Sequence, residues 1–452
     1  MHKYVLSNFL FILLLSLGLT CKAGDTLKTH FLSLDSAIIL GVSHSHQVEL
    51  AKSQLSEIHS SSEDIKNRAL PSLSLAAGYT RLSNVPTQYF RFPGIPTEIP
   101  STSLFPIILN SYSTSASLQE SVFNGFLLKY ATLNLEYTEK SAEFSLENKK
   151  KDVALNIINS YLTLFKLQQA HHLIKESLEQ IAAHVKEVSD FADHGLATQN
   201  DVLRVKLEES NTQLNDIDVN NQLQTVNYNL NIMLGMPDNT SISVDSTAIL
   251  ESKAIQPLPY YLQKSLDNRN DLKATDLQKK AAEAGIKEAQ SDLYPKLNLF
   301  GDFDYLRPNP RIVPPLDQFE GTWDVGVSIS YNLTSLYSNK NKTDVSRAKL
   351  AEVQATYDQL ADNVKIEINQ NYLQYNQSLQ KIGVAEKSLA QARENYKLVK
   401  SRYDNHISLL TDLMDANNYL LNAQINYISA KADAQLAYYN LLKSAGELNF
   451  KK

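Results

Sequence analysis

The sequence predicts a mainly α-helical chain with a smaller β part, built from two similar halves. Three observations lead to this fold class. The 452-residue chain contains helix-like stretches that are far longer than a globular core uses. Four shorter stretches alternate polar and apolar residues, as half-exposed strands do. The same order of elements occurs twice, and a repeat of this kind decides the whole fold.

The composition excludes several classes of protein. Hydrophobic residues make up 43% of the chain and charged residues 20%, so the chain is neither a typical disordered protein nor a polytopic helical membrane protein. Its formal net charge of -6 gives no support for nucleic-acid binding. We therefore expect no nucleic-acid partner.

The N-terminus has the pattern of a secretory signal peptide. Lys3 precedes an apolar run from Val5 to Thr20, which is shorter than the roughly 20 residues of a membrane-spanning helix. Small residues at Cys21 and Ala23 predict a signal peptide over residues 1–23, cleaved after Ala23. A lipoprotein acylated at Cys21 is the alternative, although the preceding Gly18-Leu19-Thr20 fits its processing signal poorly. No later stretch is long and apolar enough to span a membrane as a helix, so we expect a periplasmic, secreted or β-barrel protein.

The internal duplication is visible in matching segments. Leu70–Leu75 (LPSLSL) matches Tyr294–Leu299 (YPKLNL) in the second half. From the second strand-like segment onward the matching residues lie closer together in the chain, as Asp201 and Asp412 do. The second half is thus shorter only between its two strand-like segments, as expected for a surface loop. We expect two structural repeats, residues 24–257 and residues 258–452.

Each repeat is expected to contain a helix, a strand, a loop, a strand, a long helix and a further helix, in that order. Residues 125–191 contain neither proline nor glycine after Gly125, which predicts one helix on the order of 100 Å long. Residues 34–69 and 198–234 predict two shorter helices, which together would reach a similar length if stacked end to end. The second repeat is expected to follow the same order from 258 to 446. A plain coiled-coil stalk also has helices of such length.

The alternating stretches predict four strands. Between Trp323 and Leu333, odd-numbered residues are apolar or aromatic and even-numbered residues are polar or glycine. Strands of about 10 residues with one apolar and one polar face fit a membrane barrel with a wet interior. An antiparallel sheet packed on a soluble core is the alternative. The predicted strands of the barrel part are residues 72–82, 111–124, 296–306 and 322–333.

Four strands are too few to form such a barrel from one chain. About eight strands only just enclose a core of side chains, and lipid does not tolerate open sheet edges. A barrel built from this sequence therefore requires several chains. A trimer would supply 12 strands.

Six segments in chain order resemble the TolC-like outer membrane efflux protein family. The resemblance covers roughly residues 32–448. Each segment alone is weak evidence for the family, and the six in order are strong evidence together. The segments are Leu32–Ile38, Arg68–Leu75, Glu120–Gly125, Gly195–Leu203, Leu293–Leu299 and Ile407–Met414.

The resemblance implies a trimeric 12-stranded outer-membrane β-barrel continued by a long α-helical coiled-coil periplasmic tunnel. It implies a location in the outer membrane of a Gram-negative-type bacterium, with a periplasmic extension. The implied partners are two further copies of the chain, outer-membrane lipid, a periplasmic adaptor (membrane fusion) protein and an inner-membrane pump. The implied function is a passive export duct for small toxic compounds in a tripartite efflux system.

Two other functions remain open. The same duct could serve a type I system that secretes proteins or peptides. A function of another class is a periplasmic coiled-coil structural protein that transports nothing. The strands argue against this second alternative.

The resemblance also implies a gate at the periplasmic tip. Family members narrow the tunnel with acidic side chains early in the last inner helix, and Asp412 and Asp415 match that position. Their i, i+3 spacing puts both carboxylates on one helix face, and three chains would form a ring that favours cations. The alternative is that Asp412 only caps a helix start. Tyr403 and Asp201 resemble gate links, whereas Ser408 stands where the family has a basic residue.

The remaining site predictions concern two surfaces. The resemblance implies that two turns contact the adaptor, through Gly195, Leu196, Thr198, Ile407 and Ser408. The polar faces of the strands predict that three carboxylates line the barrel lumen, namely Asp302, Asp304 and Asp324.

No catalytic function is expected. The sequence contains no Walker loop, no Gly-x-Ser-x-Gly elbow and no His-Glu-x-x-His helix. The neighbouring histidines at 44 and 46, and at 171 and 172, do not share a helix face as a metal pair would. We expect neither a cofactor nor a metal site.

Overall fold

The computed structural model describes residues 29–84, 86–104, 107–245 and 253–450. The predicted signal peptide, its cleavage after Ala23 and the alternative lipidation of Cys21 lie outside these residues. Within the described residues, no helix combines the length and the apolarity needed to cross a membrane. The chain divides into two compact units. Unit 1 comprises the described parts of Met1–Gly41, Ile157–Glu251 and Ala385–Ala432, and unit 2 those of Val42–Asn156, Ser252–Val384 and Asp433–Lys452.

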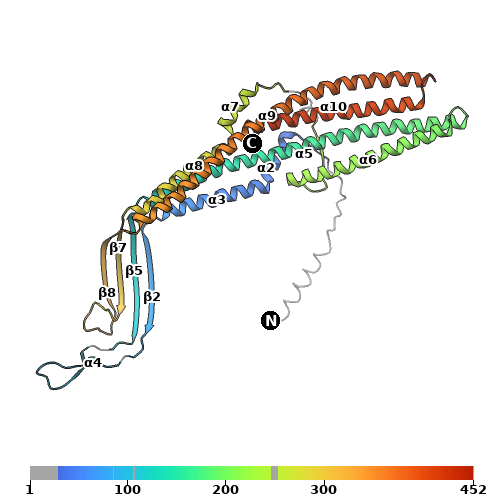
Figure 1. Cartoon of the computed structure of the whole chain (residues 1–452). Coiled ribbons are helices and arrows are strands. Elements are labelled where there is room, and N and C mark those ends of the chain that lie inside the picture. The colour runs from blue at the N-terminus through green and yellow to red at the C-terminus, as the bar shows by residue number, and fades with distance from the viewer. Residues whose placement is uncertain (1–28, 85, 105–106, 246–252, 451–452) are drawn as a thin grey trace, which may run out of the picture. The chain divides into compact units, whose positions relative to one another are not determined.

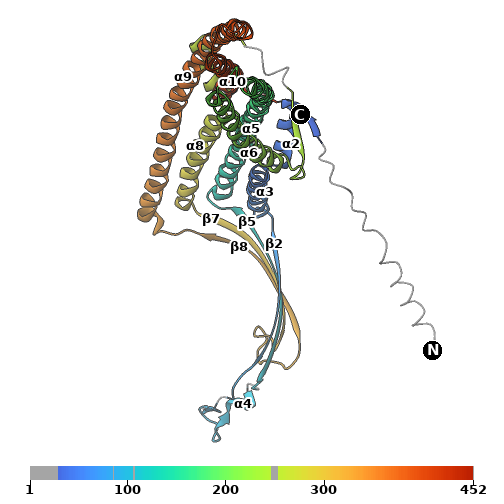
Figure 2. The same ribbon diagram turned by 90° about the vertical axis from the view of Figure 1, so that its right-hand side faces the viewer.

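Unit 2 contains a four-stranded antiparallel sheet of long strands, which curves along its length (Figures 1 and 2). The strand order is β2-β5-β7-β8, so β2 and β8 are the edges. Each strand lies close to the bounds expected from the alternating pattern. The strands are β2 (Ser72–Arg81), β5 (Asn110–Phe123), β7 (Lys296–Arg307) and β8 (Glu320–Ser330).

The sheet does not cover a core within this chain. Every residue of β2 is exposed, and so are the large apolar side chains of β8, with Trp323 at 70% and Ile329 at 74% exposure. Apolar side chains on a soluble sheet would be buried against a second layer. The alternative of a sheet packed on a soluble core is therefore wrong for the described chain.

The helices of unit 2 pack around a core of their own. The core cluster consists of buried residues from α7, α8, α9 and the end of α10: Tyr261, Leu272, Val364, Ile368, Leu441 and Ala445. Helices that contribute residues to this unit include α3 (His46–Asn67), α5 (Leu127–Asp193), α7 (Leu258–Asn268), α8 (Asn270–Ala289), α9 (Ser335–Asp404) and α10 (Leu410–Ser444).

The helix expected over residues 34–69 is interrupted. The structure has α2 (Leu34–His44) and α3 in its place, separated at Ser45, whose extended backbone ends one helix and whose side chain caps the next by accepting a bond from the backbone N–H of Val48. The second repeat breaks in the same way at Arg269, between α7 and α8. Arg269 is the counterpart of Ser45 when the two repeats are aligned, so the duplication includes the break. The expectation of a single helix was wrong. One extended residue removes only one turn of helix hydrogen bonds, and tertiary packing compensates for the stability that these bonds would have contributed.

Unit 1 contains two helical hairpins (Figure 1) and a small parallel sheet. One hairpin joins the end of α5 to α6 (Gln199–Leu234), and the other joins the end of α9 to α10. The parallel pair, β1 (Thr29–Leu32) and β6 (Ser241–Val244), was not predicted. Such short strands carry too little alternation to be recognised, and the two partners lie far apart in the chain.

Side chains from α5 hold this small sheet in place. The fully buried Tyr161 hydroxyl donates to the Leu32 carbonyl oxygen at 2.7 Å and accepts from the Asp245 N–H at 3.0 Å. The Gln168 amide nitrogen donates to the Ile242 carbonyl oxygen at 2.6 Å. Burial raises the pKa of Tyr161 to about 12, so its O–H stays available as a donor at neutral pH. These bonds satisfy strand groups that a two-stranded sheet leaves unpaired.

Candidate functional site

The first tip turn of unit 1 joins α5 to α6. Gly195 adopts a left-handed backbone with φ of 70°, and the Leu196 N–H donates to the Phe191 carbonyl oxygen at 2.8 Å. This is the usual closure of a helix by glycine. Leu196 then projects into solvent with 78% of its surface exposed. The predicted adaptor contacts Gly195, Leu196 and Thr198 are thus exposed residues of one turn.

The second tip turn, between α9 and α10, repeats this geometry without glycine. His406, the counterpart of Gly195 in the second repeat, takes the left-handed conformation with φ of 60°, and the Ile407 N–H donates to the Arg402 carbonyl oxygen at 2.8 Å. Ile407 is 66% exposed and Ser408 is half-buried. His406 was not predicted to lie in this turn conformation, because a left-handed non-glycine residue gives no strong local signal in the sequence.

Asp201 is part of a capping box at the start of α6. Its Oδ2 atom accepts from the Thr198 N–H at 3.0 Å and from the Thr198 hydroxyl at 2.7 Å, and its own N–H donates to Thr198 Oγ1 at 3.2 Å. The hydrogen bonds from the Thr198 side chain and backbone lower the pKa of Asp201. The predicted gate link Asp201 therefore has a local structural role, since such caps stabilise helix starts.

Tyr403 lies at the end of α9 against the apolar cluster of the tip. It packs on the cluster of Ile181, Val188, Val202, Val205 and Leu410, and its ring centroid lies 6.2 Å from that of His184. Burial, and then the nearby charges of Glu187, Asp201 and Asp404, raise its pKa to about 12. No hydrogen bond of the Tyr403 hydroxyl is found among the described residues. The group is therefore a neutral O–H donor that can bind an acceptor from outside this chain.

Asp412 and Asp415 lie on the exposed side of the first turns of α10. The opposite side carries Leu413 and Ala416, each 1% exposed. The Asp412 Oδ2 atom accepts from the Leu409 N–H at 3.2 Å, so Asp412 has the helix-start role that was the alternative prediction. Asp415 has no ion pair or hydrogen bond within the described part of the chain. The two carboxylates thus share an exposed face, and Asp415 has no evident structural role.

The polar face of the sheet brings together the three carboxylates predicted to line a lumen. Asp302 of β7 pairs with Asp324 of β8 on one side and with Ser117 of β5 on the other. Asp304 follows two residues along β7, on the same face. These acids stand among hydroxyl side chains of β2 and β5, including Ser74, Ser113, Ser115, Ser117 and Thr80.

Two features of this face were not predicted. Phe300 lies directly over Gly326, where an added Cβ would stand 2.6 Å from the ring, so the ring fills the space of the missing side chain. Arg311, from the loop after β7, places its Nη2 atom 2.8 Å from Asp324 Oδ2. The loop sequence has no periodicity that could place Arg311 on the sheet.

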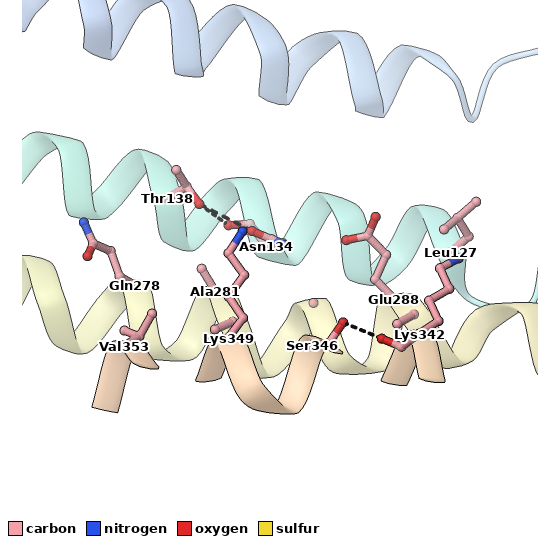
Figure 3. A pocket seen from close by; sticks show the side chains of 13 residues that line it. Leu127, Asn134, Thr138, Gln278, Ala281, Glu288, Lys342, Ser346, Lys349 and Val353 are labelled. Carbon is pink, nitrogen blue, oxygen red and sulfur yellow. Dashed lines mark hydrogen bonds between the residues drawn. The ribbon is translucent and has the colours of Figure 1, made fainter. Parts of the chain in front are cut away.

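A groove of about 510 Å³ lies among α5, α8 and α9 within unit 2 (Figure 3). The groove is lined by small residues of α8 and by Lys342 and Lys349 of α9. Lys342 also reaches Asp292 Oδ2 at 2.6 Å. The described residues contain no group of three or more His, Cys, Asp or Glu side chains that could hold a metal ion. The small residues of α8 that line the groove are Ala281, Ala282, Gly285 and Ala289.

The model of one protein family, described as outer membrane efflux protein, matches residues 44–236 and 261–447. The chain belongs to this family. One matched range lies in each half of the chain, so the match includes both tip turns and all four long strands. The family and the outer-membrane location predicted from the sequence are confirmed, and this outer membrane efflux protein has the general function of an efflux duct.

Similar proteins of known name support the same placement. The chain is 22% identical over 357 residues to outer membrane protein TolC of Salmonella enteritidis, covering 75% of this chain and 70% of that protein. It is 18% identical over 320 residues to toxin and drug export protein A of Aggregatibacter actinomycetemcomitans, covering 70% of this chain and 69% of that protein. These names denote membrane and export proteins rather than enzymes.

The fold is also that of solved outer-membrane proteins. The crystal structure of VceC from Vibrio cholerae superposes with a TM-score of 0.72 at 17% identity, over 91% of this chain and 96% of that chain. The coarse prediction of a mainly α fold with a β part, of the type found in outer-membrane channels, is therefore confirmed.

Proposed function

We propose that three copies of this outer membrane efflux protein form a passive duct for small toxic compounds in a tripartite efflux system. The observation that carries the proposal is the sheet of unit 2, which has two open edges and no core of its own. Unpaired edges and exposed apolar side chains are costly in lipid unless the sheet closes on itself. Pairing β8 of one copy with β2 of the next, three times, closes a 12-stranded barrel without an edge.

The two faces of the sheet support opposite environments for the proposed barrel. The outward face would carry Trp323, Val325 and Ile329, each at least 70% exposed in the single chain. Fully burying one such side chain in an apolar environment stabilises by roughly 1.5–3 kcal/mol. The polar face, with its hydroxyls and carboxylates, would line a wet lumen. Asp302, Asp304 and Asp324 are then lumen residues.

We also propose that the tip of unit 1 is the gate of the tunnel. In a trimer, the exposed Asp412 and Asp415 would bring six carboxylates around one axis, where their mutual repulsion keeps the ring easy to open and attractive to cations. Tyr403 would link this coil to an acceptor on a neighbouring coil, since its hydroxyl is protonated and unused within the described chain. Asp201 is the candidate acceptor through the oxygen that its cap does not use.

The energy for export would come from an inner-membrane pump, which a periplasmic adaptor connects to the duct. The exposed turns at Gly195, Leu196, Thr198, Ile407 and Ser408 are the proposed adaptor contacts. Each turn presents one large exposed apolar side chain, Leu196 or Ile407, which supports this assignment because contact with a partner would remove that apolar surface from water.

One observation favours a second candidate function. The relative from Aggregatibacter is named for the export of a toxin as well as drugs. The same duct could therefore serve a secretion system for proteins or peptides. The predicted non-transporting coiled-coil protein has no comparable support.

The duct is tested by reconstituting the purified protein into planar lipid bilayers. We expect stable single-channel currents and a particle mass of three chains in detergent. A chain that gives no current and remains a monomer would contradict the proposal. Complementation of a strain lacking its own duct then separates the candidates, because rescue of resistance to toxic compounds indicates efflux and rescue of a secreted polypeptide indicates secretion.

The adaptor contact gives a separate prediction. Replacing Leu196 and Ile407 together by serine is expected to lower pump-dependent resistance at least fourfold, because two buried apolar contacts would be lost at about 1.5 kcal/mol or more each. Single-channel conductance should stay unchanged, since both proposed gate carboxylates, Asp412 and Asp415, are kept. Leu50→Ser, at a similarly exposed leucine on α3, is the matched control and should retain resistance. Equal resistance in both variants would remove these turns from the adaptor contact.

A further inference from the structure

The loop between β7 and β8, residues 308–319, is fastened to the polar face of the sheet near its start. Asn309 is only 1% exposed, and its Nδ2 atom donates to the Glu320 carbonyl oxygen at 3.1 Å and to Thr322 Oγ1 at 3.4 Å. Its Oδ1 atom accepts from the Arg311 N–H at 2.9 Å. Because Thr322 belongs to the polar face, these bonds place residues 309–311 against that face rather than beyond the end of the strands.

Arg311 extends this attachment further along β8. Its Nη2 atom lies 2.8 Å from Asp324 Oδ2, and its Nη1 atom lies 3.4 Å from the Trp323 carbonyl oxygen. Asp324 and Thr322 are alternate residues of β8 and so share a face. The guanidinium group therefore lies over the polar face, inward of the hairpin end of the sheet.

The other end of the loop is held on the opposite face. The Phe319 ring stacks on Tyr305 with centroids 5.1 Å apart and lies 5.9 Å from Tyr112. Asp317 Oδ1 accepts from Arg307 Nε at 2.9 Å. Both ends of the loop are thus anchored by side chains of the strands. We call residues 308–319 the strap, because they cross from the apolar to the polar face and are fixed on both.

The electrostatics of the polar face explain why an arginine is placed there. Asp302 and Asp324 are direct cross-strand partners, and like charges in this position repel. Asp324 Oδ1 is covered and has no hydrogen-bond partner among the described residues. The Arg311 guanidinium is the only cation paired with this carboxylate in the described chain. It therefore neutralises part of an otherwise unfavourable acid pair.

We propose that Arg311 is a selectivity-determining residue of the duct, which holds the strap over the lumen and neutralises the Asp302–Asp324 pair. The inference rests on the proposed barrel, in which the polar face lines the lumen. Three straps then narrow the passage near the hairpin end of the barrel, and three guanidinium groups reduce its preference for cations. Releasing the strap widens the passage, and removing the arginine charge makes it more cation-selective.

Two substitutions separate the position of the strap from its charge. In planar bilayers, Arg311→Ala and Asp324→Asn should both raise the single-channel conductance, since each breaks the same ion pair. Their reversal potentials in a salt gradient should shift in opposite directions, because one variant removes a cation from the lumen and the other an anion. A charge effect without a strap predicts instead that Asp324→Asn lowers the conductance to cations.

The matched control is Arg91→Ala. Arg91 forms an ion pair of the same kind with Glu98 at 2.8 Å, but both residues belong to the connection between β2 and β5 and this pair does not reach a strand of the long sheet. Conductance and reversal potential of this variant should equal those of the wild type. If Arg311→Ala behaves like Arg91→Ala while the wild type conducts, the proposal for Arg311 is overturned and the duct remains.

Trypsin cleavage tests the strap without requiring conduction. The Arg311–Ile312 and Arg91–Phe92 bonds are both possible cleavage sites. Asp324→Asn should speed cleavage after Arg311 about two- to fivefold, the range that the loss of one exposed ion pair supports when cleavage follows the population of the open loop. Cleavage after Arg91 should not change. Equal cleavage after Arg311 in the wild type and the variant would contradict the strap, whether or not the protein conducts.

Discussion

Replacing Asp412 and Asp415 together by alanine is expected to raise single-channel conductance and to weaken block by polyvalent cations. Three copies would lose six carboxylates from the proposed ring. Each contact between a carboxylate and a unit positive charge at 4 Å contributes about 1 kcal/mol in water. Losing two or more such contacts weakens cation binding by more than about 1.4 kcal/mol, which corresponds to a tenfold change in affinity. The cation concentration for half-block should therefore rise at least about tenfold. Planar-bilayer recording with a titrated polyvalent cation measures both quantities.

A variant at Asp415 alone separates the ring from the helix start. Asp412 accepts the Leu409 N–H bond, so its loss also weakens the first turn of α10. Asp415→Asn removes one carboxylate per chain, keeps the side-chain size and leaves that bond intact. It should give an intermediate weakening of block with unchanged thermal stability. Conductance and block equal to the wild type in both variants would exclude these acids from the gate.

Replacing Arg269 by alanine is expected to destabilise unit 2 by about 3 kcal/mol, the lower end of the cost of breaking a buried ion network. Only 11% of this side chain is exposed, and it joins three helices by pairing with Asp271 of α8 and Glu367 of α9 and donating to the Ser444 carbonyl oxygen at the end of α10. Removing one member of such a network leaves the remaining charges desolvated and unpaired, which costs about 3–5 kcal/mol. The partial exposure of Glu367 places the expected value at the lower end. The midpoint of denaturant unfolding in detergent measures the loss.

Two further variants control this experiment. Arg68→Ala breaks an exposed i, i+4 pair with Asp64 and should change stability little, because exposed pairs contribute little. Arg269→Lys keeps the charge but loses the planar fork that reaches two carboxylates, so it should fall between the other two. An unfolding midpoint for Arg269→Ala that matches Arg68→Ala would show that the network does not stabilise the fold.

The same network predicts how stability depends on pH. Burial alone would raise the pKa of Asp271, but the hydrogen bonds and charge of Arg269 outweigh burial, so its pKa lies below the ordinary value of 3.8. A lowered carboxyl pKa adds stability above the unfolded value, and this contribution is lost as pH falls through the folded value. Wild type should therefore lose this contribution only below pH 3.8. In Arg269→Ala, burial without a partner raises the Asp271 pKa, and the remaining stability should decrease with rising pH through that value.

Much of the fold followed from periodicity and spacing. The alternation around Trp323 located β8, and the long stretch after Gly125 located α5, because side-chain burial repeats with the period of the backbone. Matching the segments at Leu70 and Tyr294 placed the second repeat. The acids Asp302, Asp304 and Asp324 were assigned to one face by the same two-residue period.

Other features had no such periodic signal. Ser45 interrupts a pattern that looks continuous, since one extended residue hardly changes the phase of the apolar positions. His406 reproduces the left-handed turn of Gly195 with a residue type that rarely adopts it. The β1–β6 pair joins two short segments through bonds from Tyr161 and Gln168. Each depends on contacts that a local window of sequence does not contain.

The sequence by itself determined the duplication, the long helices and the four alternating strands, and the strand count led to the proposal that more than one chain closes them. These properties follow from local periodicity and from the number of strands. Only the tertiary structure decided which charges meet: Arg269 with Glu367 on another helix, and Arg311 with Asp324 across a hairpin end. An ion pair requires its two groups within about 4 Å, and in both cases the packing of separate elements, rather than the spacing of residues in the chain, sets that distance.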